Sequence, residues 1–483
     1  MKRNSLTTAV VAGIAGVAGF AGLANAVDLN PDGLGQVLIY PYYTVNGGQD
    51  TLFSVVNTDP VNGKAVKVRF LEGYNSREVL DFNLYLSPND VWTARVSQTA
   101  DAPAGGAAVF TTDTSCTDPG PFPAAGVPFR TAAFDGSSVI PGDDGPQTID
   151  RTREGYIELI SMGDIDPTSA LAGLTFHTQN GGTPPCGVTD GVAAAGVVAP
   201  TGGLFGDADI VNVGVGTIFP YTADAVDGFS SLPLYSPSAN LNPSLQDANS
   251  VEAVNGVARA FVFTNGGQLV IADYANGIDA VSAVFMVDAI YNEYIVGGAT
   301  AANTDWIVTF PTKRFYVDKL VYPANPTSPF FEPFADGQSN IVVVPSIYDR
   351  EENTTTVQGD FSPPISTQPN SLPFEVNVIS FLTDTTAGAP SGVLASLLRP
   401  NIVPFANQGW LKLDMTSGDG GHTLTGGVTP AGAAVTFNGL PTTGYGAFNV
   451  INANAQPGLL ANYGGLFRHR ASRSCSGADP ACS

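Results

Sequence analysis

The chain has 483 residues, of which 43% are hydrophobic and 10% aromatic, so it carries more apolar material than a disordered protein and can bury a sizeable core. Acidic residues outnumber basic ones by 43 to 20, and the resulting net charge of −23 repels nucleic acids and anionic lipids. We therefore expect no nucleic-acid partner, although Arg468, His469, Arg470 and Arg473 form a small basic cluster. The 55 glycines and 36 prolines favour many turns between short strands.

The N-terminal segment has the features of a secretory signal peptide. Two basic residues precede an apolar stretch rich in Ala and Gly, and Ala24-Asn25-Ala26 supplies a small-x-small cleavage site. We predict that residues 1–26 are removed and that the mature chain begins at Val27. The alternative is an uncleaved membrane anchor, which the Gly and Ala content disfavours. No later stretch has the roughly 20 apolar residues that a spanning helix needs, so the mature chain is expected to lack a transmembrane segment.

Residues 27–100 are predicted to form a first β-sandwich segment. Two apolar runs within Gly35–Thr58 flank Asn46-Gly47-Gly48, whose glycines suit the positive φ angles of a tight turn, and this pattern predicts a hairpin. Five or six antiparallel strands in about 65 residues are typical of an immunoglobulin-like sandwich. The further strands expected here are Lys64–Leu71, Arg77–Leu86 and Val91–Val96.

The strand at Lys64–Leu71 alternates apolar and charged residues. Val66 and Val68 share one side with Phe70, whereas Lys67 and Arg69 lie on the other. This pattern predicts one buried face and one face in water.

The segment 101–203 is a predicted loop-rich insertion that carries Cys116 and Cys186. Because an even number of cysteines in an exported protein indicates disulfides, three pairings of the four are possible. We favour Cys116–Cys186 and Cys475–Cys482, since each pair lies in its own loop-rich region. Zinc is the competing interpretation, and the absence of CxxC spacing and the scattered histidines disfavour it.

Residues 204–465 are predicted to form a second β-rich region around the segment TDWIVTFPTKRFYV, residues 304–317. Its alternating apolar residues predict a central strand that breaks at Pro311 and resumes over Arg314–Val317. Asp279–Val296 fits either a helical face or a strand, and its β-branched content favours the strand. The other strands expected after residue 101 are Gly155–Met162, Ile210–Val213, Val257–Thr264, Gln268–Tyr274, Ile341–Val344, Phe374–Phe381, Gly409–Met415, Ala434–Phe437 and Tyr445–Ile451.

Two shorter features complete the predicted architecture. Ser391–Leu398 is the one short helix that the sequence indicates. The segment 466–483 is a polar, Cys-containing tail that we expect to be mobile. The predicted fold class is therefore all-β, with one or two antiparallel immunoglobulin-like sandwiches and long Gly- and Pro-rich loops.

Asp28, Asn30 and Asp32 match the first positions of a D-x-N-x-D-G calcium loop, in which oxygen ligands alternate and Gly allows a sharp turn. The twelfth position is Ile39, where such a loop needs a bidentate Glu. Ca²⁺ is thus a candidate ligand, and a polar turn-forming segment is the simpler interpretation. No other cofactor is indicated.

The sequence does not assemble an active site. It has no G-x-S-x-G nucleophile motif, and its three histidines stand alone. Asp349, Glu351 and Glu352 form a dense charged cluster that a hydrolase could use, although a solvated loop is the favoured interpretation. The aromatic runs at 40–43 and 315–316 could form a ligand platform, and burial in the core is the favoured alternative.

At GQVLIYPYYTV, TDWIVTFPTKRFYV and the closing NYGGLF, the chain resembles a group of functionally uncharacterised, exported β-rich proteins of Gram-negative bacteria. The resemblance spans most of the mature chain and is weakest in the low-complexity loops. It implies export and the β class, and it transfers no catalytic residue and no ligand.

These observations favour an exported, non-enzymatic structural or adhesion protein at the cell surface or outside the cell, with the periplasm as the alternative. Its expected partner is a further copy of itself, bound through exposed edge strands such as Val37–Val45, or a surface glycan. A carbohydrate- or polymer-binding module is the second hypothesis, and a shallow groove lined by exposed Trp or Tyr would distinguish it. A secreted hydrolase is the third hypothesis.

Overall fold

The computed structural model describes residues 26–99, 105–138, 141–177, 182–250, 258–298, 300–321, 327–356, 371–381, 388–418 and 421–482. Within these residues the chain is mainly β with a few short helices, which confirms the all-β class, while the immunoglobulin-like assignment stays a prediction. Residues 1–25 of the predicted signal peptide lie outside the described part. In that part, no helix is both long enough and apolar enough to cross a membrane.

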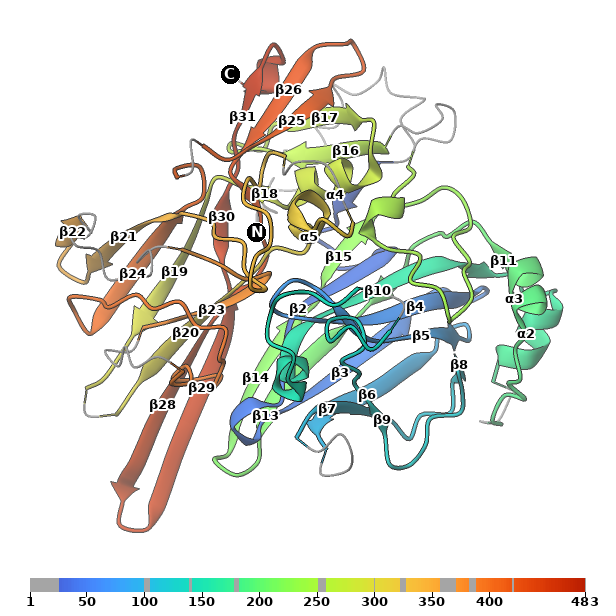
Figure 1. Cartoon of the computed structure of the whole chain (residues 1–483), viewed down its shortest axis with the longest axis horizontal. Helices are drawn as coiled ribbons and strands as arrows, with labels where there is room; N and C mark the ends of the chain where they lie inside the picture. The colour runs from blue at the N-terminus through green and yellow to red at the C-terminus, as the bar shows by residue number, and fades with distance from the viewer. Residues whose placement is uncertain are drawn as a thin grey trace, which may run out of the picture.

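Two antiparallel sheets form the N-terminal half, drawn blue to green in Figure 1. The first is ordered β1 (Asp28–Leu29), β15 (Asp224–Asp227), β2 (Val37–Thr44), β10 (Glu154–Ile165), β4 (Gly63–Glu72), β5 (Glu78–Leu86) and β8 (Cys116–Asp118), with β11 (Val197–Val198) on β10. The second is ordered β14 (Thr217–Thr222), β13 (Asp207–Asn212), β3 (Asp50–Asn57), β6 (Val91–Gln98), β7 (Ala107–Phe110) and β9 (Val127–Pro128), with β12 (Leu204–Phe205) on β3. The sheets pack face to face, since Phe82 of β5 meets Trp92 of β6 with ring centroids 5.8 Å apart.

The predicted hairpin at Gly35–Thr58 is wrong, because its two strands belong to different sheets. β2 lies between β15 and β10, whereas β3 lies between β13 and β6. The turn at η2 (Asn46–Gly48) therefore carries the chain from one sheet to the other. All eight residues of β2 are buried, so this strand needs a neighbour on both edges and cover on both faces. For the same reason the expected free edge at Val37–Val45 does not exist.

The predicted wet face of β4 is also wrong, because both cations on it are buried. Lys67 pairs with Asp81 at 2.7 Å, and Arg69 pairs with Glu78 at 2.6 Å and with Glu158 at 2.8 Å. A later segment covers this face, and Lys67 also donates to the carbonyl of Ser238. The alternation shows which residues share a face of the strand, but it could not show that a distant loop covers that face.

A small second core extends the first sheet. The short helices α2 (Ala170–Thr175) and α3 (Asp190–Gly196) pack over its outer side, and the Cys116–Cys186 disulfide lies beside them, as predicted. The insertion at 101–203 thus contributes ordered structure, including the central strand β10.

The C-terminal half, yellow to red in Figure 1, contains four antiparallel sheets among the described residues. One is ordered β16 (Ala258–Phe263), β17 (Leu269–Tyr274), β25 (Thr423–Val428), β26 (Ala434–Asn438) and β31 (Cys475–Gly477), and a pair joins β18 (Met286–Val287) to β27 (Leu440–Pro441). A second five-stranded sheet is ordered β22 (Thr354–Thr356), β21 (Val344–Asp349), β24 (Gln408–Asp414), β19 (Ala289–Ile295) and β30 (Arg470–Ser472). The four-stranded sheet is ordered β23 (Val376–Ser380), β20 (Asn303–Thr309), β28 (Tyr445–Gln456) and β29 (Leu459–Arg468).

Three local predictions in this half need correction. The segment after Pro311 forms the helical turn α5 (Arg314–Val317) rather than a resumed strand. Asp279–Val296 lies partly in the helix α4 (Gly277–Phe285) and partly in the strands β18 and β19. The helical pattern thus applies to its first part, and the strand pattern applies to the rest. Ser391–Leu398 forms turns instead of a helix, because the Asp305 carboxylate accepts from the amides of Val393 and Leu394.

Most remaining strand predictions are confirmed to within a few residues, including the β16–β17 hairpin. At Ile341–Val344 only the last residue lies in a strand. The predicted mobile tail at 466–483 instead supplies β30 and β31 to two sheets. The predicted Cys475–Cys482 disulfide closes it.

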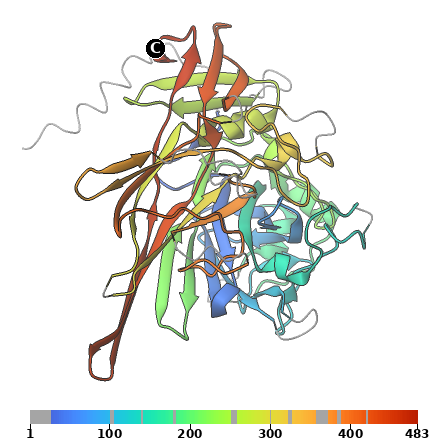
Figure 2. The same ribbon diagram turned by 60° about the vertical axis from the view of Figure 1, so that its left-hand side comes forward.

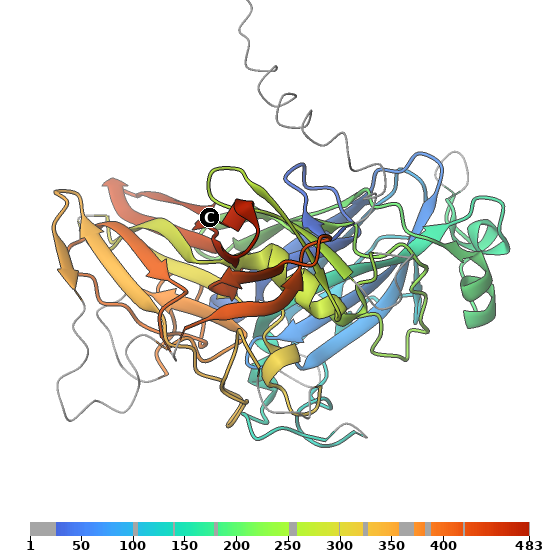
Figure 3. The same ribbon diagram turned by 90° about the horizontal axis from the view of Figure 1, so that it is seen from above.

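The two halves share one continuous hydrophobic core. Thr309 of β20 donates to the carbonyl of Pro41 in β2 at 2.7 Å, and Asn462 of β29 donates to the carbonyl of Val215 beside β14 at 2.8 Å. Seen from above in Figure 3, the halves lie side by side, and Figure 2 shows the β28–β29 hairpin reaching past the rest of its sheet.

Candidate functional site

The residues of the candidate calcium loop lie on β1 and in the turn that follows it. Asp28 lies on β1 directly opposite Asp227 of β15, and burial followed by the Asp227 charge raises the pKa of Asp28 to about 6. The Asn30 amide shapes a turn, since it donates to the carbonyl of Leu34 and accepts from the amide of Asp32. Across the described residues, no group of three or more His, Cys, Asp or Glu is placed to hold a metal ion. Calcium binding therefore stays a prediction.

The predicted charged cluster at 349–352 forms a turn. The Asp349 carboxylate accepts from the Asn353 side chain and from the amides of Asn353 and Glu351, at 2.8 to 2.9 Å. The hydrogen bond from the Asn353 side chain is the largest cause of the lowered pKa of Asp349, so this carboxylate stays ionised. The turn lies at the rim of a groove that the sequence did not reveal.

The aromatic residues named from the sequence are buried. Tyr40, Tyr42 and Tyr43 are fully enclosed in the core, and the Tyr42 hydroxyl donates to Glu154 at 2.8 Å. Phe315 and Tyr316 are at most 5% exposed. Tyr40, Tyr42 and Tyr43 thus stabilise the fold, whereas Phe315 and Tyr316 also line a cavity described below.

A groove of about 860 Å³ lies between the sheet of β19, β21 and β24 and the β28–β29 hairpin. We call it the aromatic groove, because an aromatic pair from each side lines it. Its volume falls within the usual range for ligand sites, roughly 300–1,000 Å³. The lining residues used below are Tyr291, Asn292, Glu293, Asp349, Arg350, Glu352, Gln408, Trp410, Phe448, Phe467, Arg468 and Arg470.

One wall of the aromatic groove holds Trp410 and Tyr291 on adjacent strands. The Trp410 ring stacks on Tyr348 of β21, with centroids 4.3 Å apart and planes 11° apart, and its centroid is 6.5 Å from that of Tyr291. Trp410 is nevertheless 40% exposed. An exposed indole that is fixed by a neighbouring ring can contact a ligand at a low cost in conformational entropy.

The opposite wall holds Phe448 and Phe467 on the β28–β29 hairpin. Their rings are parallel within 5°, with centroids 5.5 Å apart, and Phe467 is 54% exposed. Gly446 lets this hairpin approach β19, because a Cβ at that position would lie 2.7 Å from the amide nitrogen of Asn292.

A polar network beside the aromatic groove joins Asn292, which lines the groove, to the buried His469. The Asn292 side-chain amide donates to the Phe467 carbonyl at 3.0 Å and lies 3.2 Å from Nδ1 of His469. His469 Nε2 lies 3.0 Å from the Ile307 carbonyl, and burial lowers the pKa of His469 to about 4. The imidazole is therefore neutral, donates to Ile307 and accepts from Asn292.

Charges of both signs surround the aromatic walls. Arg350 donates to Gln408 at 3.1 Å, and Arg468 is ion-paired with Asp224, while Glu293 and Glu352 provide acceptors. No His, Cys, Ser or Lys is among the described residues that line the groove. This combination of apolar walls and a polar, charge-balanced rim suits the binding of a ligand that has both apolar and hydroxylated surfaces.

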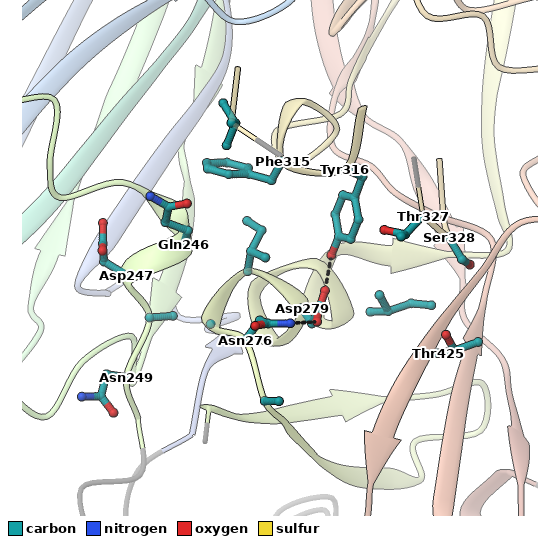
Figure 4. A pocket seen from close by; sticks show the side chains of 16 residues that line it. Gln246, Asp247, Asn249, Asn276, Asp279, Phe315, Tyr316, Thr327, Ser328 and Thr425 are labelled. Atoms are coloured by element: carbon teal, nitrogen blue, oxygen red, sulfur yellow. Dashed lines mark hydrogen bonds between the residues drawn. The ribbon is translucent and has the colours of Figure 1, made fainter. Parts of the chain in front are cut away.

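A second cavity of about 620 Å³ lies at the start of α4, and we call it the α4 cavity. In Figure 4, Gln246 and Asn249 stand on one side and Thr425 on the other, with Asp279 between them. Tyr316 donates to one Asp279 oxygen at 2.7 Å, and Asn276 donates to the other at 3.1 Å.

The sequence did not reveal the aromatic groove or the α4 cavity, because their walls come from segments far apart in the chain. The aromatic groove joins residues near 292, 350, 410, 448 and 467, and none of these segments contains a recognisable ligand motif. The available signal was the alternation of aromatic with polar residues in the strands around Tyr291 and Trp410. Comparison of the chain with protein-family models, curated proteins and solved structures found no match.

Proposed function

We propose that this protein is an exported, non-enzymatic adhesion protein that binds a polysaccharide in the aromatic groove. The observation that carries the proposal is the presence of facing aromatic pairs, Tyr291 with Trp410 and Phe448 with Phe467, beneath a polar rim. Sugar rings have apolar C–H surfaces and hydroxylated edges, which match such walls and such a rim respectively. The predicted signal peptide and the two disulfides support an oxidising location, at the cell surface or outside the cell.

Binding can be measured through Trp410, because it is the one exposed tryptophan of the three in the chain. Trp92 and Trp306 are fully buried, whereas Trp410 is 40% exposed. A polysaccharide that occupies the groove should protect Trp410 from acrylamide and shift its emission to the blue. Affinity electrophoresis in gels that contain individual polysaccharides would identify the polymer.

The matched variants are Trp410→Ala and Phe467→Ala, with Phe263→Ala as the control. Phe263 is 61% exposed on β16, outside the groove, so its loss tests for a general effect of removing an exposed ring. We expect the two groove variants to weaken binding about tenfold or more, which corresponds to at least about 1.4 kcal/mol, and the control to bind normally. Equal binding by all three variants would refute the proposed site, and release of shortened oligosaccharides would show an enzyme instead.

A second proposed function, self-assembly, rests on the edge of β28. The strand pairs with β20 only up to Asn449 and continues to Gln456, and residues 450–456 contain no charged side chain. An uncharged free edge is a site for strand addition by another copy. Ile451 donates to the carbonyl of Thr300, so the unpaired part of this edge begins after Ile451. The register with β29 shifts between Asn452 and Gln456, and Ala455 lies in this irregular end of the strand. Ala455→Pro should abolish any oligomers seen by sedimentation velocity, and a wild-type protein that stays monomeric would reject this function.

A further inference from the structure

We propose that the α4 cavity is a second binding site, specific for a small neutral saccharide or polyol. Its volume of about 620 Å³ is large enough for one or two sugar rings. It is formed by α4, α5, the segment around η4 (Leu245–Asp247) and β25, so it is separate from the aromatic groove.

The lining of the α4 cavity selects against anions. Asp247 and Asp279 are its two charged residues among the described lining, which contains no Lys, Arg or His. Both carboxylates are held by local donors: Asp247 accepts from the amide of Ser244 at 2.7 Å, and Asp279 accepts from Tyr316 and Asn276. An anionic ligand would meet two fixed negative charges with no compensating cation.

The same lining offers hydrogen bonds to hydroxyl groups. The side chains of Gln246, Asn249, Thr327 and Thr425 make no hydrogen bond to other described residues, so their amides and hydroxyls remain available. Amides and hydroxyls both donate and accept, as the hydroxyl groups of a sugar do. Ile278 and Leu424 add an apolar surface against which the C–H face of a ring can pack.

An organic cation is the other ligand that two carboxylates could attract. Each carboxylate is already engaged by protein donors, and most of the remaining polar lining is neutral, so the structure favours an uncharged ligand. Amine probes are therefore included in the test, and a response to them alone would contradict the proposal.

The test is a thermal-shift series with glucose, galactose, N-acetylglucosamine and glycerol as neutral probes, and with glucuronate, glucosamine and choline as charged probes. A ligand at about 100 times its Kd stabilises the folded state by about 2.7 kcal/mol, which is readily seen as a rise in Tm. The site variant is Gln246→Ala/Asn249→Ala, whose removed side chains make no structural hydrogen bond among the described residues. The matched control is Gln268→Ala/Asn240→Ala, on exposed positions outside both hollows.

We expect at least one neutral probe to raise the Tm of the wild type, of the control and of Trp410→Ala, and to have no effect on the Gln246→Ala/Asn249→Ala variant. The Trp410→Ala protein separates this site from the aromatic groove, so either site can fail without the other. The inference is overturned if no neutral probe shifts the Tm, if only charged probes do, or if the shift is lost in Trp410→Ala and kept in the cavity variant.

Discussion

Trp410 and Tyr348 stack across β24 and β21 with ring centroids 4.3 Å apart, and this contact holds the exposed indole in place at the wall of the aromatic groove. Stacked aromatic pairs contribute about 0.5–1.5 kcal/mol beyond their buried area. Tyr348 itself does not line the groove. Its effect on ligand binding should therefore act through the position of Trp410.

We predict that Tyr348→Ala increases acrylamide quenching of Trp410 and weakens polysaccharide binding by about three- to tenfold, in line with the loss of such a pair. Tyr348→Phe keeps the ring and should retain both properties. If Tyr348→Ala leaves quenching unchanged, the stack does not position the indole.

The buried ion pair between Arg151 and Glu72 provides a test of stability. Both side chains are fully buried, their atoms are 2.8 Å apart, and Arg151 also pairs with Asp143 at 2.6 Å. Arg151→Met leaves the buried Glu72 carboxylate without its cation, while Asp143 keeps Arg77 at 3.2 Å, and it should lower the free energy of unfolding by about 3–5 kcal/mol. Arg153→Met is the control, because its pair with Asp150 is partly exposed to solvent and should contribute less than about 1 kcal/mol. Urea denaturation would measure both, and equal losses would contradict the prediction.

The two disulfides should differ in their contribution to stability. Cys116 and Cys186 are separated by 70 residues, whereas Cys475 and Cys482 are separated by 7. Loop-closure entropy in the unfolded chain then gives about 4 kcal/mol for the first bridge and about 2.5 kcal/mol for the second. Paired Cys→Ser variants under oxidising conditions would measure the difference, and a larger loss for the short loop would oppose the entropic account.

His469 should make the fold sensitive to acid. Burial lowers its folded-state pKa from 6.5 to about 4, so the unfolded chain binds the proton more readily between these values. The contribution is fully present above pH 6.5 and is lost as the pH falls toward 4, by up to about 3 kcal/mol. His469→Gln should flatten this part of the stability profile, and His177→Gln, which changes a partly exposed ring, should not. An unchanged profile in His469→Gln would assign the acid sensitivity elsewhere.

Asp28 should have the opposite pH dependence. Its folded-state pKa is raised to about 6, so its contribution is greatest below pH 3.8 and is lost as the pH rises through 6. Asp28→Asn should therefore stabilise the protein at pH 7, by no more than about 1 kcal/mol because the side chain is partly exposed to solvent. Asp32→Asn, at an exposed position, is the control. Destabilisation by Asp28→Asn at pH 7 would contradict this view of the Asp28–Asp227 pair.

The sequence by itself determined the β class, most strand positions and both disulfides. Alternating side chains mark a strand such as β5, and Gly-rich turns mark a hairpin such as β16–β17, because these signals are local. The paired cysteines could be assigned because each pair lies within its own region. Alternation also placed Trp306 and Val308 in the core.

Only the tertiary structure decided which strands are neighbours, which faces are covered and where the two hollows lie. β2 and β3 adjoin in sequence and still belong to different sheets, and Lys67 is buried because a segment near Ser238 covers it. Likewise, Trp410 of β24 and Phe467 of β29 line the same aromatic groove, although their strands belong to different sheets. Local patterns encode the conformation of a segment, whereas sheet order and grooves depend on the free energy of packing between distant segments, which no local pattern contains.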